Sequence, residues 1–302
     1  DGSSITIPEF VHGIVISSDH NILRGLQIVG FSDAGVALSP GSQHNLIGGD
    51  RNIGDGPLGQ GNLISGNHYG LGMWEEATSH NTIQGNYIGI TVDGTAAWGN
   101  DQDGIHSVGA RQNLITDNVI GGNETGIYLS WVMDGGNTVT GNLIGVGPDG
   151  NPLANTTGII IDHTSHNIVG PGNTIAYNRG DGISFWEETS NNTVTRNSIH
   201  DNRGRGILIT SPSQSTLQPP RILSFDLKTG TVSGTACPNC IIEIFSDGGD
   251  QGAIFEGSII ADRNGAFAFM KAASLAGPFL TATATDPDGN TSEFSLPARG
   301  SP

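Results

Sequence analysis

Residues 182–199 read GISFWEETSNNTVTRNSI, and this stretch decides the fold. It begins with Gly and a short apolar strand, passes through a polar turn, and continues as two more short strands that each follow an Asn. Versions of this phrase recur along the chain, and they begin at Gly13, Gly35, Gly70, Gly104, Gly126, Gly158, Gly182 and Gly206. A unit that repeats at such a period is the signature of a solenoid.

The apolar residues within each repeat alternate. Ile127 and Leu129 point to one side of their strand, and Tyr128 and Ser130 point to the other. Such alternation indicates strands with one buried face. Three short strands per repeat, stacked in parallel on the next repeat, predict an all-β parallel β-helix of about eight rungs over residues 1–210. The longer repeats carry insertions at residues 49–60, 91–100 and 147–155.

Asparagines recur at the corners between the predicted strands. One column precedes the second strand, and another lies near the next corner: Asn81, Asn113, Asn137, Asn167 and Asn192, then Asn86, Asn118, Asn142 and Asn197. Asn tolerates left-handed backbone and can bond the chain at turns. We therefore expect inward-facing, stacked asparagines that satisfy corner backbone groups, and not a catalytic role.

This pattern resembles the pectin-lyase-like superfamily of right-handed parallel β-helices, and Gly182–Phe185 with Asn192–Ile199 carry the resemblance best. It covers roughly residues 10–210 and implies a right-handed coil. The superfamily includes hydrolases, lyases, epimerases, adhesins and binding modules, so the resemblance is specific for the fold and weak for function.

The repeat stops after Ile209. Residues 211–220 contain Ser, Gln and Pro and are predicted to be a linker. Residues 221–302 contain alternating runs separated by Asp247-Gly248, Asn264-Gly265 and Asp288-Gly289, which predict a small immunoglobulin-like β-sandwich. Cys237 and Cys240 are expected to form a local disulfide or to remain free thiols.

Composition limits the possible partners. The chain has 12 Lys and Arg against 29 Asp and Glu, and its net charge is −17. Nucleic acid is excluded, because phosphate binding requires a basic stripe, and acidic polysaccharides are disfavoured by repulsion. A neutral polysaccharide would not be repelled by this negative charge. No membrane span or signal peptide is visible, and we expect a secreted, extracellular monomer without a required cofactor.

Tryptophans mark one predicted corner. Trp74, Trp131 and Trp186 fall on the third, fifth and seventh rungs, with the register of Trp131 open by one residue. Two rungs are about 9.6 Å apart, close to the disaccharide repeat of an extended β-1,4-linked glucan. Indole faces suit sugar rings, so these side chains are predicted to bind glycan. The alternative is that they cover the corner against a loop.

Polar residues beside the tryptophans could line a groove, with His106, Tyr128 and His163 as further substrate contacts. Glycoside cleavage typically needs two carboxyl groups. Asp162 with Glu187 or Glu188 is the best predicted pair, and Glu75 or Glu76 with Asp103 is the second. Acidic residues at turns are usually only solvated, which is the competing interpretation.

Three functions therefore stay open. The first is a glycoside hydrolase that cleaves a neutral, cellulose-like plant glycan, and the second is a non-catalytic carbohydrate-binding module. The third is a polysaccharide lyase or a structural, adhesive solenoid. The repeats contain no Lys and lack the paired Asp-Asp, Gly-His-Gly and Arg-Ile-Lys of polygalacturonases. No metal site is predicted, although calcium near Asp101 and Asp103 or Asp286 and Asp288 is compatible with the spacing.

Overall fold

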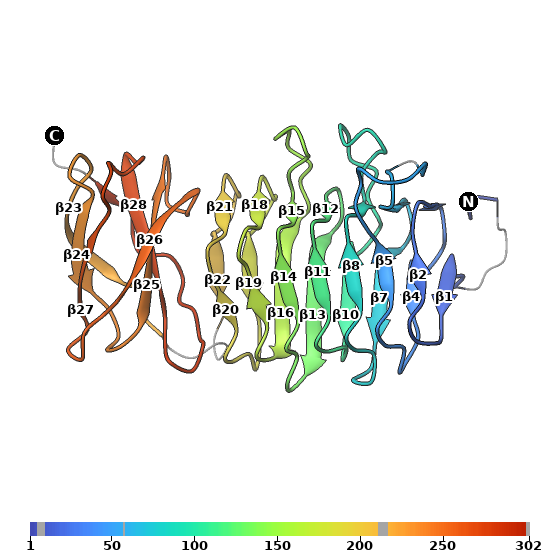
Figure 1. Ribbon diagram of the computed structural model, residues 1–302, viewed down its shortest axis with the longest axis horizontal. Helices are drawn as coiled ribbons and strands as arrows, with labels where there is room; N and C mark the ends of the chain where they lie inside the picture. Colours follow the sequence, from blue (N-terminus) through green and yellow to red (C-terminus); the bar gives the residue numbers. More distant parts are fainter. Residues whose placement is uncertain (5–9, 57, 211–216, 300–302) are drawn as a thin grey trace.

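The computed structural model describes residues 1–4, 10–56, 58–210 and 217–299. Within these ranges there are only strands, turns and loops. A solenoid of parallel strands forms the N-terminal two thirds of the chain, and a smaller antiparallel part follows it along the long axis (Figure 1). The predicted parallel β-helix is confirmed, whereas residues 211–216 of the predicted linker lie outside the described ranges.

Three parallel sheets run the length of the solenoid. Sheet A contains eight strands, one for each predicted rung: β1 (Ile14–Ile16), β4 (Ala34–Leu38), β7 (Tyr69–Trp74), β10 (Ile105–Val108), β13 (Thr125–Val132), β16 (Thr157–Thr164), β19 (Ile183–Phe185) and β22 (Ile207–Ile209). Sheet B contains β2 (Ile22–Leu23), β5 (Leu46–Gly48), β8 (Thr82–Gln84), β11 (Leu114–Thr116), β14 (Thr138–Thr140), β17 (Ile168–Val169) and β20 (Thr193–Val194). Sheet C contains β3 (Gln27–Val29), β6 (Leu63–Ser65), β9 (Tyr87–Ile88), β12 (Val119–Ile120), β15 (Leu143–Ile144), β18 (Thr174–Ala176) and β21 (Ser198–His200).

Equivalent residues of successive rungs stand directly above one another. Ile105 pairs with Ile127, and Ile127 pairs with Ile159. Each sheet contributes such a column of Ile, Val or Leu to one core that is continuous along the solenoid. Because every rung covers the apolar residues of its neighbours, the repeat in the sequence is sufficient to build the core.

The corner asparagines form ladders, as predicted. At each step, the side-chain oxygen of one Asn accepts bonds from the backbone and side-chain N–H groups of the Asn one rung below. Asn118 Oδ1, for example, accepts Asn86 N at 2.9 Å and Asn86 Nδ2 at 3.0 Å. A third ladder closes the corner between sheets C and A, and it consists of Asn67, Asn100, Asn123, Asn155, Asn178 and Asn202. This third column is not among the Asn columns predicted from the sequence.

The C-terminal part consists of two antiparallel sheets around a separate core. One contains β23 (Arg221–Asp226), β24 (Thr231–Thr235) and β27 (Ala266–Met270). The other contains β25 (Ile241–Asp247), β26 (Ile254–Ile260), β28 (Phe279–Thr285) and β29 (Ala298–Arg299). These sheets form the predicted small sandwich, while its immunoglobulin-like topology and the boundary at residue 221 stay predictions.

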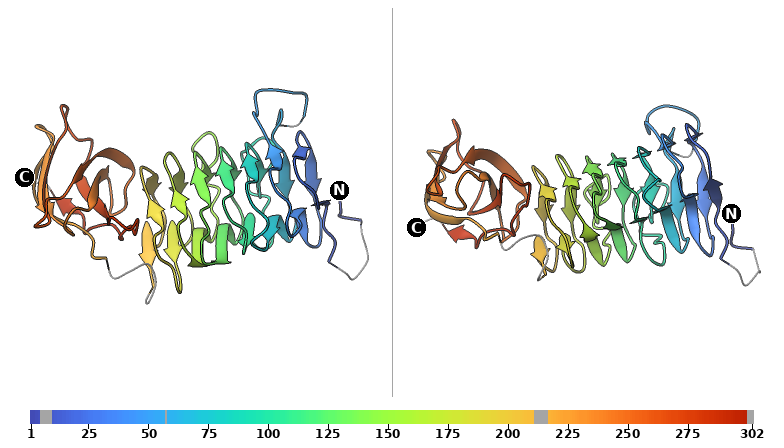
Figure 2. Two further views of the ribbon diagram at one scale, coloured as in Figure 1. Left: turned by 60° about the horizontal axis from the view of Figure 1, so that its bottom comes forward. Right: turned by 90° about the horizontal axis from the view of Figure 1, so that it is seen from below.

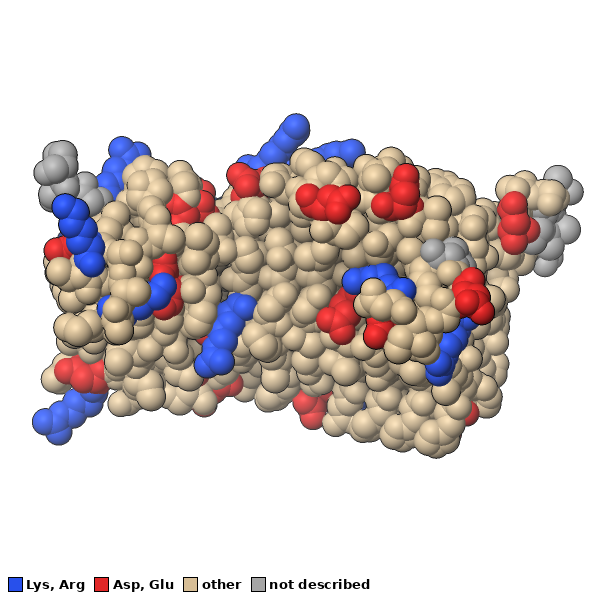
Figure 3. All heavy atoms as spheres, turned by 45° about the horizontal axis from the view of Figure 1, so that its top comes forward, with Lys and Arg blue, Asp and Glu red and all other residues tan. Residues whose placement is uncertain are grey.

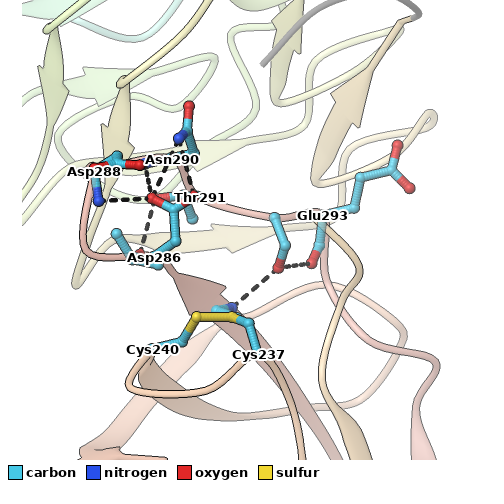
Figure 4. Close-up of a disulfide and its surroundings, with 10 residues drawn as sticks. Cys237, Cys240, Asp286, Asp288, Asn290, Thr291 and Glu293 are labelled. Atoms are coloured by element: carbon cyan, nitrogen blue, oxygen red, sulfur yellow. Dashed lines mark hydrogen bonds between the residues drawn. A yellow bond between two sulfur atoms is a disulfide. The ribbon is translucent and has the colours of Figure 1, made fainter. Parts of the chain in front are cut away.

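Cys237 and Cys240 are joined by a disulfide in the loop that precedes β25 (Figure 4). In the same view, Asp286 closes the turn after β28. Its Oδ1 accepts the backbone N–H of Asp288 and of Asn290, and both of its oxygens accept the Asn290 side chain. This carboxylate therefore has a structural role in the turn.

The sandwich lies against the last rung of the solenoid (Figure 2). Ile199 and Gly252 exchange two backbone hydrogen bonds, and Phe294 packs on the solenoid core. Gln251 extends the third ladder, because its Oε1 accepts Asn202 Nδ2 at 3.0 Å. A side chain of the sandwich thus occupies the place that the next Asn would take.

Candidate functional site

The outer face of sheet A carries a group of neighbouring aromatic side chains. The register places Gly72, His106 and Tyr128 in one outward column on β7, β10 and β13. Five rings on this face form what we call the aromatic strip: Tyr69, Trp74, His106, Tyr128 and Trp186. Because successive rungs stack along the solenoid axis, the strip runs parallel to that axis.

Neighbouring rings of the strip lie close together. The ring centroids of Tyr69 and His106 are 4.5 Å apart. His106 stacks on Tyr128 at 5.5 Å with an interplanar angle of 17°. Tyr128 meets Trp186 edge to face at 6.4 Å, although an entire rung lies between them. The strip is therefore continuous from β7 to the end of β19.

Trp74 folds back onto the sheet instead of extending from its end. A Cβ atom on Gly72 would lie only 2.0 Å from the indole, so the ring covers this glycine. The indole is 5.8 Å from the His12 ring and 6.3 Å from the His106 ring. Gly72 therefore makes room for the tryptophan, a relation that the repeat pattern did not reveal.

Trp131 lies outside the strip. The register pairs Ser130 with Val108 and with Asp162, so Trp131 falls one position beyond the column that holds Trp74 and Trp186. Both Trp131 and His163 have left-handed backbone, with φ of 57° and 47°. Their rings stack at 4.2 Å, and Trp131 is 60% exposed. The three tryptophans are accessible, but they do not form a single straight row.

Asp162 is a buried carboxylate on β16, beside the strip. Its Oδ2 accepts the Tyr128 hydroxyl at 2.9 Å, and its Oδ1 lies 2.8 Å from His163 Nδ1. Only 6% of the residue is exposed. Burial, together with the hydrogen bond to Asp162 and the charge of that carboxylate, raises the pKa of Tyr128 to about 12. The tyrosine therefore stays a neutral donor that orients the carboxylate.

Glu187 and Glu188 follow Trp186 in an exposed turn. Glu187 stands opposite His163, because its carbonyl oxygen accepts the His163 N–H at 2.8 Å. Asp162 and Glu187 thus belong to adjacent rungs and are offset by one residue. The two residues of this predicted pair therefore lie on neighbouring rungs, close to the same end of sheet A.

The second predicted pair is not brought together. Glu75 and the exposed Glu76 follow the end of β7, and the N–H of Glu75 bonds to the Val108 carbonyl. Asp103 precedes the start of β10, six residues before Gly109. Because a strand advances by about 3.3 Å per residue, these six residues place Asp103 roughly 20 Å from the glutamates. Asp103 instead pairs with His106, whose Nδ1 lies 2.6 Å from Asp103 Oδ2.

An open hollow of about 460 Å³ lies at the N-terminal end of the strip. Residues from several rungs line it: Phe10, His12, Asp33, His68, Tyr69, Trp74 and His106. His12, Asp33 and Tyr69 are not among the site residues predicted from the sequence. His12 and Tyr69 directly precede repeat glycines, in the same column as Asp103, and this column was the signal that could have found them.

Metal ligands and membrane-spanning helices also bear on the function of the ranges that the structure describes. No group of three or more His, Cys, Asp or Glu side chains is placed to hold a metal ion in those ranges. The same ranges contain no helix with the length and hydrophobicity that crossing a membrane requires.

Comparisons with known proteins give distant matches. A family described as periplasmic copper-binding protein (NosD) matches residues 89–206. Among solved structures, the mannuronan C-5 epimerase AlgE4 A-module of Azotobacter vinelandii is 15% identical with a TM-score of 0.36, covering 67% of this chain and 55% of that one. A Dettilon tailspike protein is 14% identical with a TM-score of 0.39, covering 97% and 67%.

No curated protein matches the chain. The chain spans 55% of the length of the epimerase module, and similarities this distant say nothing about the reaction. The repeat and the three stacked parallel sheets agree with the fold that the pectin-lyase-like resemblance implies. On this evidence the chain is a right-handed parallel β-helix protein.

Proposed function

We propose that the outer face of sheet A binds a polysaccharide chain without acidic groups, such as a neutral β-linked plant glycan, along the solenoid axis. The observation that supports this most directly is the aromatic strip. From β7 to β19 it covers four rung steps, or roughly 19 Å, which is long enough for several sugar rings. Aromatic faces provide the rigid, apolar surface on which sugars stack.

The charge distribution favours a neutral chain over a uronate. Two carboxylates, Asp103 and Asp162, lie directly beside the strip, and an acidic polymer would meet their repulsion. On the face of the molecule drawn in Figure 3, charged side chains are scattered over a mostly uncharged surface. As before, we expect a secreted monomer, a proposal that rests on composition.

Retention on insoluble cellulose tests the proposal. Trp186 is 42% exposed and belongs to the strip, whereas Trp98 is 41% exposed and lies in the loop after β9. The two residues are therefore a matched pair. We expect Trp186→Ala to reduce retention several-fold and Trp98→Ala to leave it unchanged. Equal retention by both variants, or no retention of the wild type on any glycan, would refute binding by the strip.

Hydrolysis of the bound chain is the second candidate, and the surroundings of Asp162 favour it. This carboxylate is buried beside the strip, and the exposed Glu187 and Glu188 lie on the next rung. Such an arrangement could supply the two carboxyl groups of a glycosidase. If so, Asp162→Asn abolishes the release of reducing sugar from the retained glycan, while Asp149→Asn in an exposed loop has no effect. If the protein is retained on the glycan but releases no reducing sugar, it is a binding module and not a hydrolase.

A further inference from the structure

We infer that the hollow at the N-terminal end of the aromatic strip is a subsite for a sugar that carries a positively charged amino group. The inference rests on the proposed function, and it names the substrate class more narrowly. On this basis the preferred ligand is a β-1,4-linked chain with free 2-amino groups, and the uncharged parts of the same chain stack along the rest of the strip.

Three aromatic rings other than histidine are among the residues that line the hollow. Phe10, Tyr69 and Trp74 contribute rings, and the indole lies 5.8 Å from the His12 ring. The faces of such rings attract a cation, and closely spaced rings form the cages that bind ammonium groups. Several rings at one hollow therefore suit an ammonium group as well as the apolar face of a sugar.

Carboxylates complete the cation site. Asp33 lines the hollow, and its side chain is 18% exposed. Asp103 is not part of the lining but contacts His106, which is, and the Asp103 side chain is 12% exposed. Burial raises the pKa of Tyr69 first, and the charges of Asp103, Asp33 and Glu124 raise it further, so these carboxylates would favour a positive charge near its hydroxyl group. No Lys or Arg is among the described residues that line the hollow.

The polar atoms of the hollow are not fully paired with one another. His12 Nδ1 is buried without a hydrogen-bond partner among the described residues, and it lies 3.5 Å from Asp33 Oδ2. Asp33 Oδ1 is held by the N–H of Ala34 at 3.0 Å. One carboxylate oxygen is therefore fixed by the backbone, and the other faces His12, where an ammonium donor can join the pair.

The test compares three tetrasaccharides with the same β-1,4 linkage, which are cellotetraose, N-acetylglucosamine tetramer and glucosamine tetramer. Binding is measured by calorimetry at pH 6, because the oxygen atoms around a sugar 2-amino group make it less basic than a Lys amine, and it must be protonated for this comparison. We expect the glucosamine tetramer to bind about tenfold more tightly than either neutral tetramer at low salt. Its advantage should shrink as salt is added, because salt screens exposed charges.

Two variants test whether the charge of Asp33 causes the preference for the glucosamine tetramer. Asp33→Asn retains an oxygen for the Ala34 N–H and removes the charge, so it should abolish the preference for the glucosamine tetramer. Asp149→Asn removes one charge from an exposed loop and should retain the preference. Unchanged thermal unfolding of Asp33→Asn confirms that it is folded.

The outcomes separate the two proposals. Equal binding of charged and neutral tetramers, or equal effects of the two variants, overturns the amino-sugar subsite and leaves the binding strip intact. Failure of all three tetramers to bind contradicts the proposed function itself.

Discussion

At the scale of single residues, Asp162 is the side chain with the most specific environment. It is an outward-facing residue on β16, a position where a short polar side chain would ordinarily be solvated, yet it is buried between Tyr128 and His163. The Trp131 ring stacks on the His163 ring and covers one face of that imidazole. The carboxylate is thus contacted by Tyr128 from the neighbouring rung and by His163, the next residue of its own strand.

Removal of the Asp162 charge should be visible in the titration of Tyr128. The pKa of Tyr128 is raised to about 12 by burial first, then by the hydrogen bond and the charge of Asp162. In Asp162→Asn the negative charge no longer opposes the tyrosinate, so the pKa should fall toward the ordinary value of about 10. Ultraviolet absorbance of tyrosinate measures it, with Tyr128→Phe to identify the signal. An unchanged titration would contradict the Asp162–Tyr128 contact.

At the scale of the element, the Asn ladder connects each rung to the next. Asn118 accepts two bonds from Asn86, donates to the Ile83 carbonyl at 2.9 Å, and donates to Asn142 at 3.0 Å. It is fully buried. Its amide therefore satisfies corner groups that would otherwise be desolvated without partners, and such groups are costly to leave unpaired.

Asn118→Ala should destabilise the protein by about 3 kcal/mol, because several buried donors and acceptors lose their partner at once. Chemical denaturation monitored by circular dichroism measures the change in the free energy of unfolding. Asn264→Ala, in an exposed turn of the sandwich, provides the control and should change that free energy by less than about 0.5 kcal/mol. A similar effect of both substitutions would show that the ladder adds little.

The elements that the sequence predicts correctly are those set by strict repetition. The columns of Ile127 and Asn118 follow from spacing alone, because every rung must cover the one below it. The positions of the Trp131 and Trp74 side chains cannot be predicted from the repeat. The position of Trp131 depends on a left-handed backbone at the end of β13, and that of Trp74 depends on the absence of a side chain at Gly72. Neither feature is periodic, so neither appears in the repeat.

The candidate site was only partly predictable for the same reason. The repeat register placed His106, Tyr128 and Asp162 on the outer face of sheet A, and they lie there. The pairing of Asp162 with Tyr128, however, is a contact between a side chain on β16 and a ring on β13. Such contacts depend on rotamers, which a pattern of residue types does not determine.

At the scale of the whole molecule, the sandwich closes the last rung of the solenoid. An uncovered terminal rung exposes apolar residues and unpaired strand edges, and solenoids therefore need a capping structure. Gln251 continues the third Asn ladder, and Phe294 covers the end of the apolar core. Arg205 of the solenoid and Glu293 of the sandwich form an ion pair at 2.7 Å. The C-terminal part is thus integral to the solenoid end.

Glu243 makes this junction sensitive to pH. It lies on β25, is 3% exposed, and accepts the Thr195 hydroxyl at 2.6 Å and the Arg196 N–H at 2.9 Å. Burial raises its pKa, although these hydrogen bonds act in the opposite direction. In the folded protein the carboxyl group therefore binds a proton more tightly than in the unfolded chain. Its contribution to stability is fully present below the unfolded pKa of about 4.3 and is lost as pH rises through the folded pKa.

Glu243→Gln removes this titration and retains an oxygen for the Arg196 N–H. Near pH 4, where the glutamic acid is largely protonated, wild type and variant should unfold at similar temperatures. As pH rises toward 7, the variant should become progressively more stable than the wild type, because only the wild type must bury a charge. Scanning calorimetry of both proteins across this range measures the difference, in which all other titrating groups cancel. If the wild type instead gains on the variant as pH rises, the pKa of Glu243 is lowered in the folded protein, and the ionised carboxylate stabilises the junction.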